Sequence, residues 1–266
     1  MADDLVLLDV KNGVANVTLN RPDVHNAFDE NVIARLTEIF DELASRKDVY
    51  AVILRGAGKS FSAGGDINWM KRVAAYTEDQ NYDDALKLAT MLNKLYTLPK
   101  VTIACVQGAA MGGGLGLVAC CDIVMAVKTA IFALSEVKLG LIPATIAPYV
   151  LRALGERQSR MYFQTGQRFT GGRAYDIGLV HELAESEGEM NELLRGVLAN
   201  LSANGPKAMA AAKELCLDLA GQPLTPDVLN GTARRIAKTR AGEEAKEGLS
   251  AFLEKRKPAW VNEGGS

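Results

Sequence analysis

The chain has little of what several classes of protein require. Its 30 basic and 32 acidic residues leave a net charge of −2, so no overall field attracts nucleic acid or an anionic membrane. No apolar run approaches the length of a membrane span, and the acidic N-terminus lacks the basic region and apolar core of a signal peptide. We therefore expect a soluble, cytoplasmic protein with no nucleic-acid or membrane partner.

Cysteine and histidine are also scarce. The two histidines, His25 and His181, lie outside any Gly-x-Ser-x-Gly or metal-binding pattern, so neither a hydrolase triad nor a zinc site is predicted. The four cysteines lie in apolar segments without metal-ligand spacing, which predicts reduced core thiols and no metal: Cys105, Cys120, Cys121 and Cys216.

Glycine, in contrast, is concentrated in the stretch of residues 101–143. A short apolar run at 101–106 predicts a strand buried on both faces, and a glycine cluster follows it before an apolar helix. Glycines at such a turn let a ligand approach the backbone and leave the first helical N–H groups free for negative charge. Close helix packing would explain the same cluster. The stretch also places the carboxylate of Glu136 shortly before Pro143.

The rest of the chain alternates strands and helices up to about residue 186. A hairpin turn at Asn12-Gly13 joins two strands, and Asp29 is expected to cap a helix. A loop at Gly65 repeats the layout of the loop at Gly113, 48 residues later, so the two are either equivalent loops facing one ligand atom or unrelated turns. Further elements are predicted as strands at 5–10, 14–20, 50–54 and 179–183, and helices at 79–96, 146–154 and 157–165.

Only helical signals remain in the last part of the chain. They predict helices at residues 188–203, 206–220 and 225–256. We therefore divide the chain into an α/β core, residues 1–186, and a helical region, residues 187–266, that packs on the core or on another subunit.

Six segments in this order resemble the crotonase, or enoyl-CoA hydratase/isomerase, superfamily. They are NRPDVHNAFD (20–29), KSFSAGGDI (59–67), VQGAAMGGGLGLVACCDI (106–123), FALSEVKLGLIP (132–143), GLV (178–180) and AFLEKRKPAW (251–260). The resemblance implies an α/β spiral of ββα units, a helical C-terminal trimerisation region and usually a hexamer made of two trimers. It also implies an acyl-CoA substrate, so coenzyme A enters with the substrate and no separate cofactor is expected.

The same resemblance implies roles for particular residues. A thioester enolate oxygen would be held by the backbone N–H groups of Gly65 and Gly113, each worth about 10²- to 10³-fold in rate. The adenine and pantetheine path would be lined around Ala63, Asp66 and Ile67, with His25 in the early loop on the same side. In the tail, Phe252 and Lys255 match positions that contact the CoA of a neighbouring subunit, although a solvated basic helix end would look the same.

One departure from the family pattern concerns the acids. Two-glutamate hydratases carry the first acid in a GGGxE motif. In this chain the position of that glutamate, which belongs to the substrate-binding region, is occupied by Gly116. Glu136 matches the second acid and is assigned as the single general acid/base, the alternative being an ordinary carboxylate at a helix start. One carboxylate can pass a proton from water to C2 during hydration, or move a proton between C2 and C4 during isomerisation.

Finer resemblance favours hydration of branched substrates. The segments LSEVKLGLIPATIAPYV, GLGLVACCD and GGDINWMKR look like bacterial methylglutaconyl-CoA and isohexenylglutaconyl-CoA hydratases of leucine or acyclic terpene breakdown. Such substrates carry a second carboxylate, for which Lys71 and Arg72, beside Trp69, and also Lys138 are candidate partners; a solvent-facing pair is the other reading of Lys71 and Arg72. The alternatives are an enoyl-CoA isomerase and a non-catalytic acyl-CoA binder, the latter disfavoured because Glu136 and both glycines are present.

Overall fold

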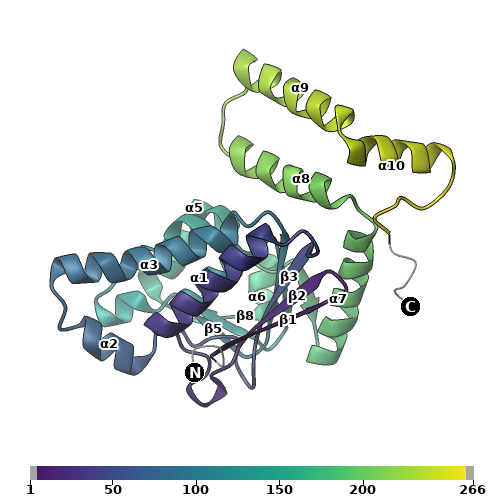
Figure 1. Cartoon of the computed structure of the whole chain (residues 1–266). Helices are drawn as coiled ribbons and strands as arrows, with labels where there is room; N and C mark the ends of the chain where they lie inside the picture. The colour runs from purple at the N-terminus through teal and green to yellow at the C-terminus, as the bar shows by residue number, and fades with distance from the viewer. Residues whose placement is uncertain (1–4, 262–266) are drawn as a thin grey trace.

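A six-stranded sheet forms the centre of the computed structural model, which describes residues 5–261 (Figure 1). In spatial order its strands are β1 (Val6–Lys11), β2 (Val14–Leu19), β3 (Ala51–Gly56), β4 (Val101–Val106), β6 (Ile123–Val127) and β9 (Glu182–Ala184). β1 and β2 are antiparallel and every later neighbour is parallel. The hairpin is confirmed, since Asn12 and Gly13 take φ values of +51° and +78° in the turn.

A second, three-stranded sheet was not predicted from the sequence. It consists of β5 (Ala109–Met111), β7 (Ile131–Ala133) and β8 (Phe169–Thr170). Each of these strands has only two or three residues, too few to produce a period-two pattern. The sheet matters for the site because β5 leads into the glycine cluster and β7 leads into Glu136.

Helices cover the sheet and bury most of its apolar side chains. They are α1 (Glu30–Ser45), α2 (Ile67–Val73), α3 (Glu78–Tyr96), α4 (Gly113–Cys120), α5 (Ala147–Thr165) and α6 (Gly171–Asp176), with the short 3₁₀ helices η2 (Pro22–Val24) and η3 (Glu136–Leu139). Asp29 caps α1 as predicted, because its carboxylate accepts from the N–H groups of Asn31 and Val32. Helix α3 contacts α1 on one side and α4 on the other, and α4 is buried almost completely, which explains its apolar sequence.

Helix α5 contains the break expected between residues 154 and 157. Gly155 has φ +73° and ψ 162°, so the helix is interrupted there. The last predicted strand lies a few residues later than expected: Leu179 and Val180 are buried before the strand, and β9 begins at Glu182.

The C-terminal region is helical, as predicted, and α8 to α10 stand away from the core in Figure 1. Its helices are α7 (Glu187–Ser202), α8 (Pro206–Leu219), α9 (Pro226–Ala241) and α10 (Glu243–Leu253). The single helix predicted for residues 225–256 is wrong, because Gly242 takes an extended conformation (φ −76°, ψ 155°) and ends α9. Lys213 of α8 bonds to Asp122 at 2.9 Å and so ties this region to the core.

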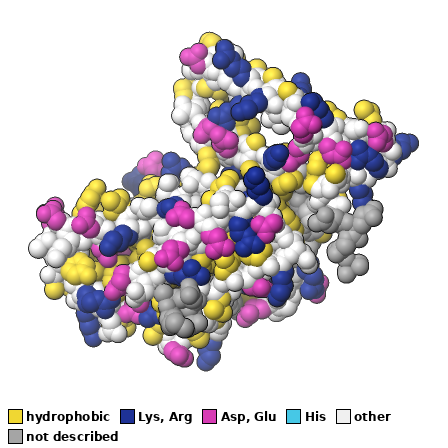
Figure 2. All heavy atoms as spheres, in the orientation of Figure 1, with side chains coloured by type: hydrophobic (Ala, Val, Ile, Leu, Met, Phe, Trp, Pro, Cys, Tyr) yellow, Lys and Arg dark blue, Asp and Glu magenta, His cyan; other side chains and the backbone are white. Residues whose placement is uncertain are grey.

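Helices α8 to α10 leave many apolar side chains uncovered. Figure 2 shows hydrophobic side chains among these helices, together with acidic and basic ones. The prediction that all four cysteines are core thiols is wrong for Cys216, which is exposed because this chain packs little against α8. Within residues 5–261, none of the helices has both the length and the apolar character needed to cross a membrane.

Candidate active site

Two loops run side by side into the N-termini of two helices. Ser62 pairs in parallel with Ala110: the Ser62 N–H donates to Ala109 and the Met111 N–H donates to the Ser62 carbonyl, both at 2.9 Å. Three residues beyond each of these paired positions lie Gly65, just before α2, and Gly113, the first residue of α4. The two loops are therefore paired side by side, which makes unrelated turns the weaker of the two interpretations left open by the sequence.

The backbone N–H groups of Gly65 and Gly113 are free donors. Neither donates a hydrogen bond within the described part of the chain. Gly113 is the first residue of α4, where N–H groups have no intrahelical partner and the positive end of the helix dipole lies, and Gly65 directly precedes Asp66, the N-cap of α2. Both groups are thus available to an oxygen that develops negative charge.

Phe28 joins the two glycine positions. Its N–H donates to the Gly64 carbonyl and its carbonyl accepts from the Asp66 N–H, both at 2.7 Å, so it pairs with Gly65 on the edge opposite the free N–H. Its ring lies 3.0 Å from the position that a Cβ on Gly113 would take. One buried residue therefore contacts both proposed donors, and a side chain at position 113 would displace it.

Arg21 holds the two helix starts in place, a role that the sequence did not reveal. Its guanidinium donates to the Asp66 carboxylate at 2.9 Å and to the Ala27 carbonyl at 2.7 Å, and lies 3.4 Å from the Asp29 carboxylate. Asp66 and Asp29 are the N-caps of α2 and α1. The only sequence signal was an arginine at the end of a strand, and its partners are distant in the chain.

The pKa of Asp66 reflects this environment. Burial raises the pKa, but hydrogen bonds from the N–H groups of Trp69 and Asn68 and from Arg21 outweigh it, so the pKa of Asp66 lies below its usual value. Its N–H and carbonyl are also bonded within the chain, to Phe28 and Met70. Asp66 therefore positions the loop that contains Gly65.

Glu136 lies at the start of η3, directly after β7, and faces the beginning of α4. Its Oε1 is 3.3 Å from the position of a Cβ on Gly112, and its Oε2 is buried without a hydrogen-bond partner in residues 5–261. Desolvation by burial raises the pKa of Glu136, partly opposed by its own backbone N–H. A buried, unpaired carboxyl group with a raised pKa is the usual state of a general acid/base.

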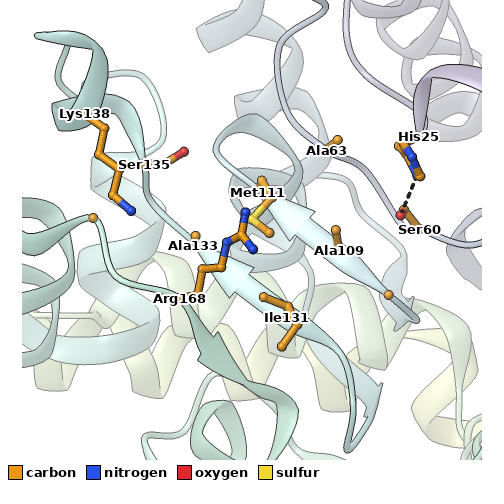
Figure 3. Close-up of a pocket in the computed structure, with 12 residues that line it drawn as sticks. His25, Ser60, Ala63, Ala109, Met111, Ile131, Ala133, Ser135, Lys138 and Arg168 are labelled. Atoms are coloured by element: carbon orange, nitrogen blue, oxygen red, sulfur yellow. Dashed lines mark hydrogen bonds between the residues drawn. The ribbon is translucent and has the colours of Figure 1, made fainter.

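A cavity of about 610 Å³ adjoins these elements (Figure 3). Its lining includes Ala63 and Met111, each two residues before a proposed donor, and Ser135, directly before Glu136. At one end His25 Nδ1 is hydrogen-bonded to Ser60 Oγ at 3.1 Å; Lys138 lies at the other end, and Arg168 lies between them beside Met111. Glu136, Gly65 and Gly113 do not line this cavity; their chain neighbours do.

The remaining predicted residues lie in different surroundings. Trp69 is partly buried and donates to Asp84 at 3.3 Å, Ile67 and Lys71 are exposed, and Gly116 is buried against Ile146. Arg72 donates to both oxygens of the Glu30 carboxylate, at 2.6 and 2.8 Å, so a substrate carboxylate would have to compete with this ion pair. Phe252 and Lys255 are exposed near the end of α10 and do not line the cavity of their own chain.

No group of three or more His, Cys, Asp or Glu side chains suited to a metal ion occurs in residues 5–261. His181 has a structural role: its Nδ1 accepts from the Val124 N–H at 3.0 Å, and its own N–H donates to the Val124 carbonyl at 2.8 Å.

The sequence matches the family model described as Enoyl-CoA hydratase/isomerase over residues 9–263. A solved enoyl-CoA hydratase from Shewanella pealeana is 41% identical with a TM-score of 0.93, and the match covers 96% of each chain. Pseudomonas aeruginosa AtuE is 35% identical with a TM-score of 0.94, over 97% of this chain and 100% of that chain. The enoyl-CoA hydratase ACTT6 of Alternaria alternata is 33% identical over 246 residues, 90% of this chain and 78% of ACTT6.

Proposed function

The chain belongs to the enoyl-CoA hydratase/isomerase family, and we propose that it adds water to the 2,3 double bond of a branched acyl-CoA, 3-methylglutaconyl-CoA or isohexenylglutaconyl-CoA. Membership makes it an enzyme that acts on acyl-CoA thioesters, and relatives named enoyl-CoA hydratases have a hydro-lyase activity. The observation that carries the proposal is the Glu136 carboxylate, whose Oε2 is buried and unpaired and which faces the beginning of α4, where Gly113 offers a free N–H.

In the proposed reaction the thioester oxygen accepts hydrogen bonds from the N–H groups of Gly65 and Gly113. Glu136 removes a proton from water as the water oxygen bonds to C3, and the electrons of the double bond move into the thioester to form an enolate. Glu136 then returns the proton to C2, which gives the 3-hydroxyacyl-CoA. Each backbone donor contributes about 10²- to 10³-fold, because it is fixed before negative charge develops on the oxygen.

Isomerisation is the second candidate, and the single carboxylate favours it. With Gly116 in place of a second acid, Glu136 alone serves the proton transfers at the site. A carboxylate that removes a proton from C4 and returns it to C2 moves the double bond without adding water. Hydration requires that Glu136 also orient the attacking water.

Lys138 is the best placed of the three cations considered for a distal carboxylate. It lines the cavity with Arg168, and neither has an ion-pair partner in the described part of the chain. The stem of Lys138 packs on Gly166, with its Cε 3.2 Å from the position of a Cβ there. In this proposal Lys138 and Arg168 bind the second carboxylate, whereas Arg72 is occupied by Glu30.

Assembly into trimers, and into hexamers of two trimers, is part of the proposal. Phe252 and Leu253 near the end of α10 are 79% and 78% exposed, which is unusual for large apolar side chains unless another surface covers them. In such an assembly Phe252 and Lys255 would contact the CoA of a neighbouring subunit. Light scattering on the purified protein tests this; a monomer at micromolar concentration would contradict it.

A substrate panel tests the proposed reaction. The enzyme is incubated separately with methylglutaconyl-CoA, isohexenylglutaconyl-CoA, crotonyl-CoA and a 3-enoyl-CoA, and the products are identified by mass and chromatography. The proposal predicts that a branched glutaconyl ester gains one water and is the preferred substrate. A product of unchanged mass with a moved double bond would establish isomerisation instead.

A further inference from the structure

Gly116 and Ile146 share one space at the first turn of α4. A Cβ on Gly116 would stand 2.3 Å from Ile146 Cγ2 and 3.0 Å from Ile146 Cβ. Separations below about 3.0 Å are not found between real side chains, so even an alanine at position 116 requires Ile146 to move. The glycine is therefore required by its neighbour, since its own φ is not in the left-handed region.

This shared space lies one turn along α4 from Gly112, the glycine that the Glu136 carboxylate faces. Gly112 and Gly116 are four residues apart, and the Gly116 N–H donates to the Gly112 carbonyl at 3.0 Å, so one helical turn separates them. Glu136 stands over Gly112, with Oε1 3.3 Å from its Cβ position, and Ile146 stands over Gly116. A side chain at position 116 would therefore start one helical turn from the glycine that Glu136 faces, in the space that Ile146 now fills.

Ile146 is held firmly in this position. It precedes α5, where its carbonyl accepts from the N–H groups of Tyr149 and Val150 at 3.1 Å each, and it is 2% exposed. Leu92 of α3, itself fully buried, lies 3.8 Å from the same Cβ position on Gly116. Apolar side chains from two helices thus fill the space on both sides.

We propose that Gly116 and Ile146 form a matched pair that restricts this site to one carboxylate. Ile146 is a positioning residue: it fills the volume that an acidic side chain at position 116 would need and keeps water away from Glu136. This inference rests on the proposed role of Glu136 as the acid/base. It agrees with the burial that raises the pKa of Glu136, because water in this space would solvate the carboxylate and lower that pKa.

Thermal unfolding tests the pairing without reference to activity. Gly116→Ala is measured in the parent and in an Ile146→Ala background, where the Cγ2 that lies 2.3 Å away is absent. We expect Gly116→Ala to lower Tm by about 5 to 10 °C in the parent and by less than half of that in the Ile146→Ala background. Gly196→Ala, in a helix with no atom within 4 Å, is the control that should not lower Tm. Equal losses in both backgrounds would overturn the pairing.

The pH dependence of kcat/KM tests the effect on Glu136. Ile146→Ala opens space for water beside the carboxylate, so the acidic limb should move about half a pH unit or more toward the ordinary carboxyl value. Ile146→Val keeps the branched Cβ and should retain the parent profile. If Ile146 had a purely structural role, Ile146→Ala would lower stability without moving the acidic limb of the pH profile. An unchanged acidic limb in Ile146→Ala would therefore overturn the positioning role.

The double variant Gly116→Glu/Ile146→Gly tests whether the space filled by Ile146 can hold an acidic side chain. It removes the side chain at position 146 and introduces a carboxylate at position 116. It should turn over crotonyl-CoA about tenfold faster than Ile146→Gly alone and show a second ionisation in its pH profile. No gain together with a single ionisation would overturn the claim that this space can hold a second acid. If Glu136→Gln leaves parent turnover unchanged, the proposed function fails, and the thermal cycle still decides whether the two residues are paired.

Discussion

Glu136 Oε1 lies 3.3 Å from the position that a Cβ on Gly112 would occupy. Gly112 has φ +48°, and its N–H donates to the Ala133 carbonyl at 2.9 Å, so the turn into α4 depends on a residue that tolerates a left-handed backbone. Because Gly112 has no side chain, it also leaves room for the Glu136 carboxylate. The glycine cluster therefore serves the turn, the access of Glu136 and, through Gly113, a free N–H.

The raised pKa of Glu136 predicts a pH dependence of activity. The ionised carboxylate is the base in the proposed step, so kcat/KM should fall as pH falls through the raised pKa. Because burial shifts this pKa above 4.5, the acidic limb should lie above that value. A rate profile from pH 4 to 9 measures it, and a limb at or below the ordinary carboxyl value would contradict the burial of the functional carboxylate.

The same shift predicts how stability depends on pH. While the Glu136 carboxyl group is protonated, its burial does not destabilise the folded state. As pH rises through the raised pKa of the folded state, the carboxyl group becomes charged and the protein loses stability. Glu136→Gln should therefore have nearly the parent Tm near pH 4 and a higher Tm than the parent near pH 8. Thermal unfolding at both pH values tests this; a Tm difference that does not change with pH would show that the Glu136 pKa is not raised.

Removing one backbone donor should slow the reaction without preventing folding. Gly65→Pro eliminates the N–H and should lower kcat about 10²- to 10³-fold. Gly65→Ala is the matched control, because a Cβ there meets the nearest atoms of Trp69 and Met70 at 3.4 and 3.5 Å, an ordinary contact, and the N–H remains. If both variants lose activity equally while retaining the parent Tm, the N–H of Gly65 is not the donor.

The two cations at the cavity should distinguish substrates that have a second carboxylate from those that lack one. Lys138→Gln and Arg168→Gln should each raise KM for methylglutaconyl-CoA about tenfold or more, because each removes a charge-assisted hydrogen bond. KM for crotonyl-CoA should change less than about twofold. The exposed Lys71→Gln is the control variant. Equal increases for both substrates would instead assign the cations to the phosphates of CoA.

Local signals in the sequence predicted those parts of the fold that depend on neighbouring residues. The strand at residues 101–106, the Asp29 cap and the break at Gly155 all follow from composition and spacing within a few residues. The short strands β5, β7 and β8 do not, because they are stabilised by partners elsewhere in the chain. The break at Gly242 was missed because a helix with one glycine gives nearly the same pattern as two helices.

Some residues of the candidate site could likewise be predicted from the sequence, and others could not. Glu136, Gly65 and Gly113 were identified by motif, and the parallel course of their two loops became evident only from the pairing of Ser62 with Ala110. Arg21, Arg168 and Ile146 carry no signal of their own, since their importance comes from contacts with distant residues. The absence of an acid at position 116 was readable from the sequence; the side chain that fills its place was not.

Glu136→Gln provides the most direct test of the account, measured as kcat with the preferred substrate of the panel together with the affinity for CoA. Turnover should fall about 10²- to 10⁴-fold, because the amide can neither accept nor return the proton, while CoA binds as to the parent. Glu156→Gln, an exposed carboxylate on α5, should remain at the parent rate. Near-parent turnover in Glu136→Gln would contradict the assignment of Glu136 as the single acid/base.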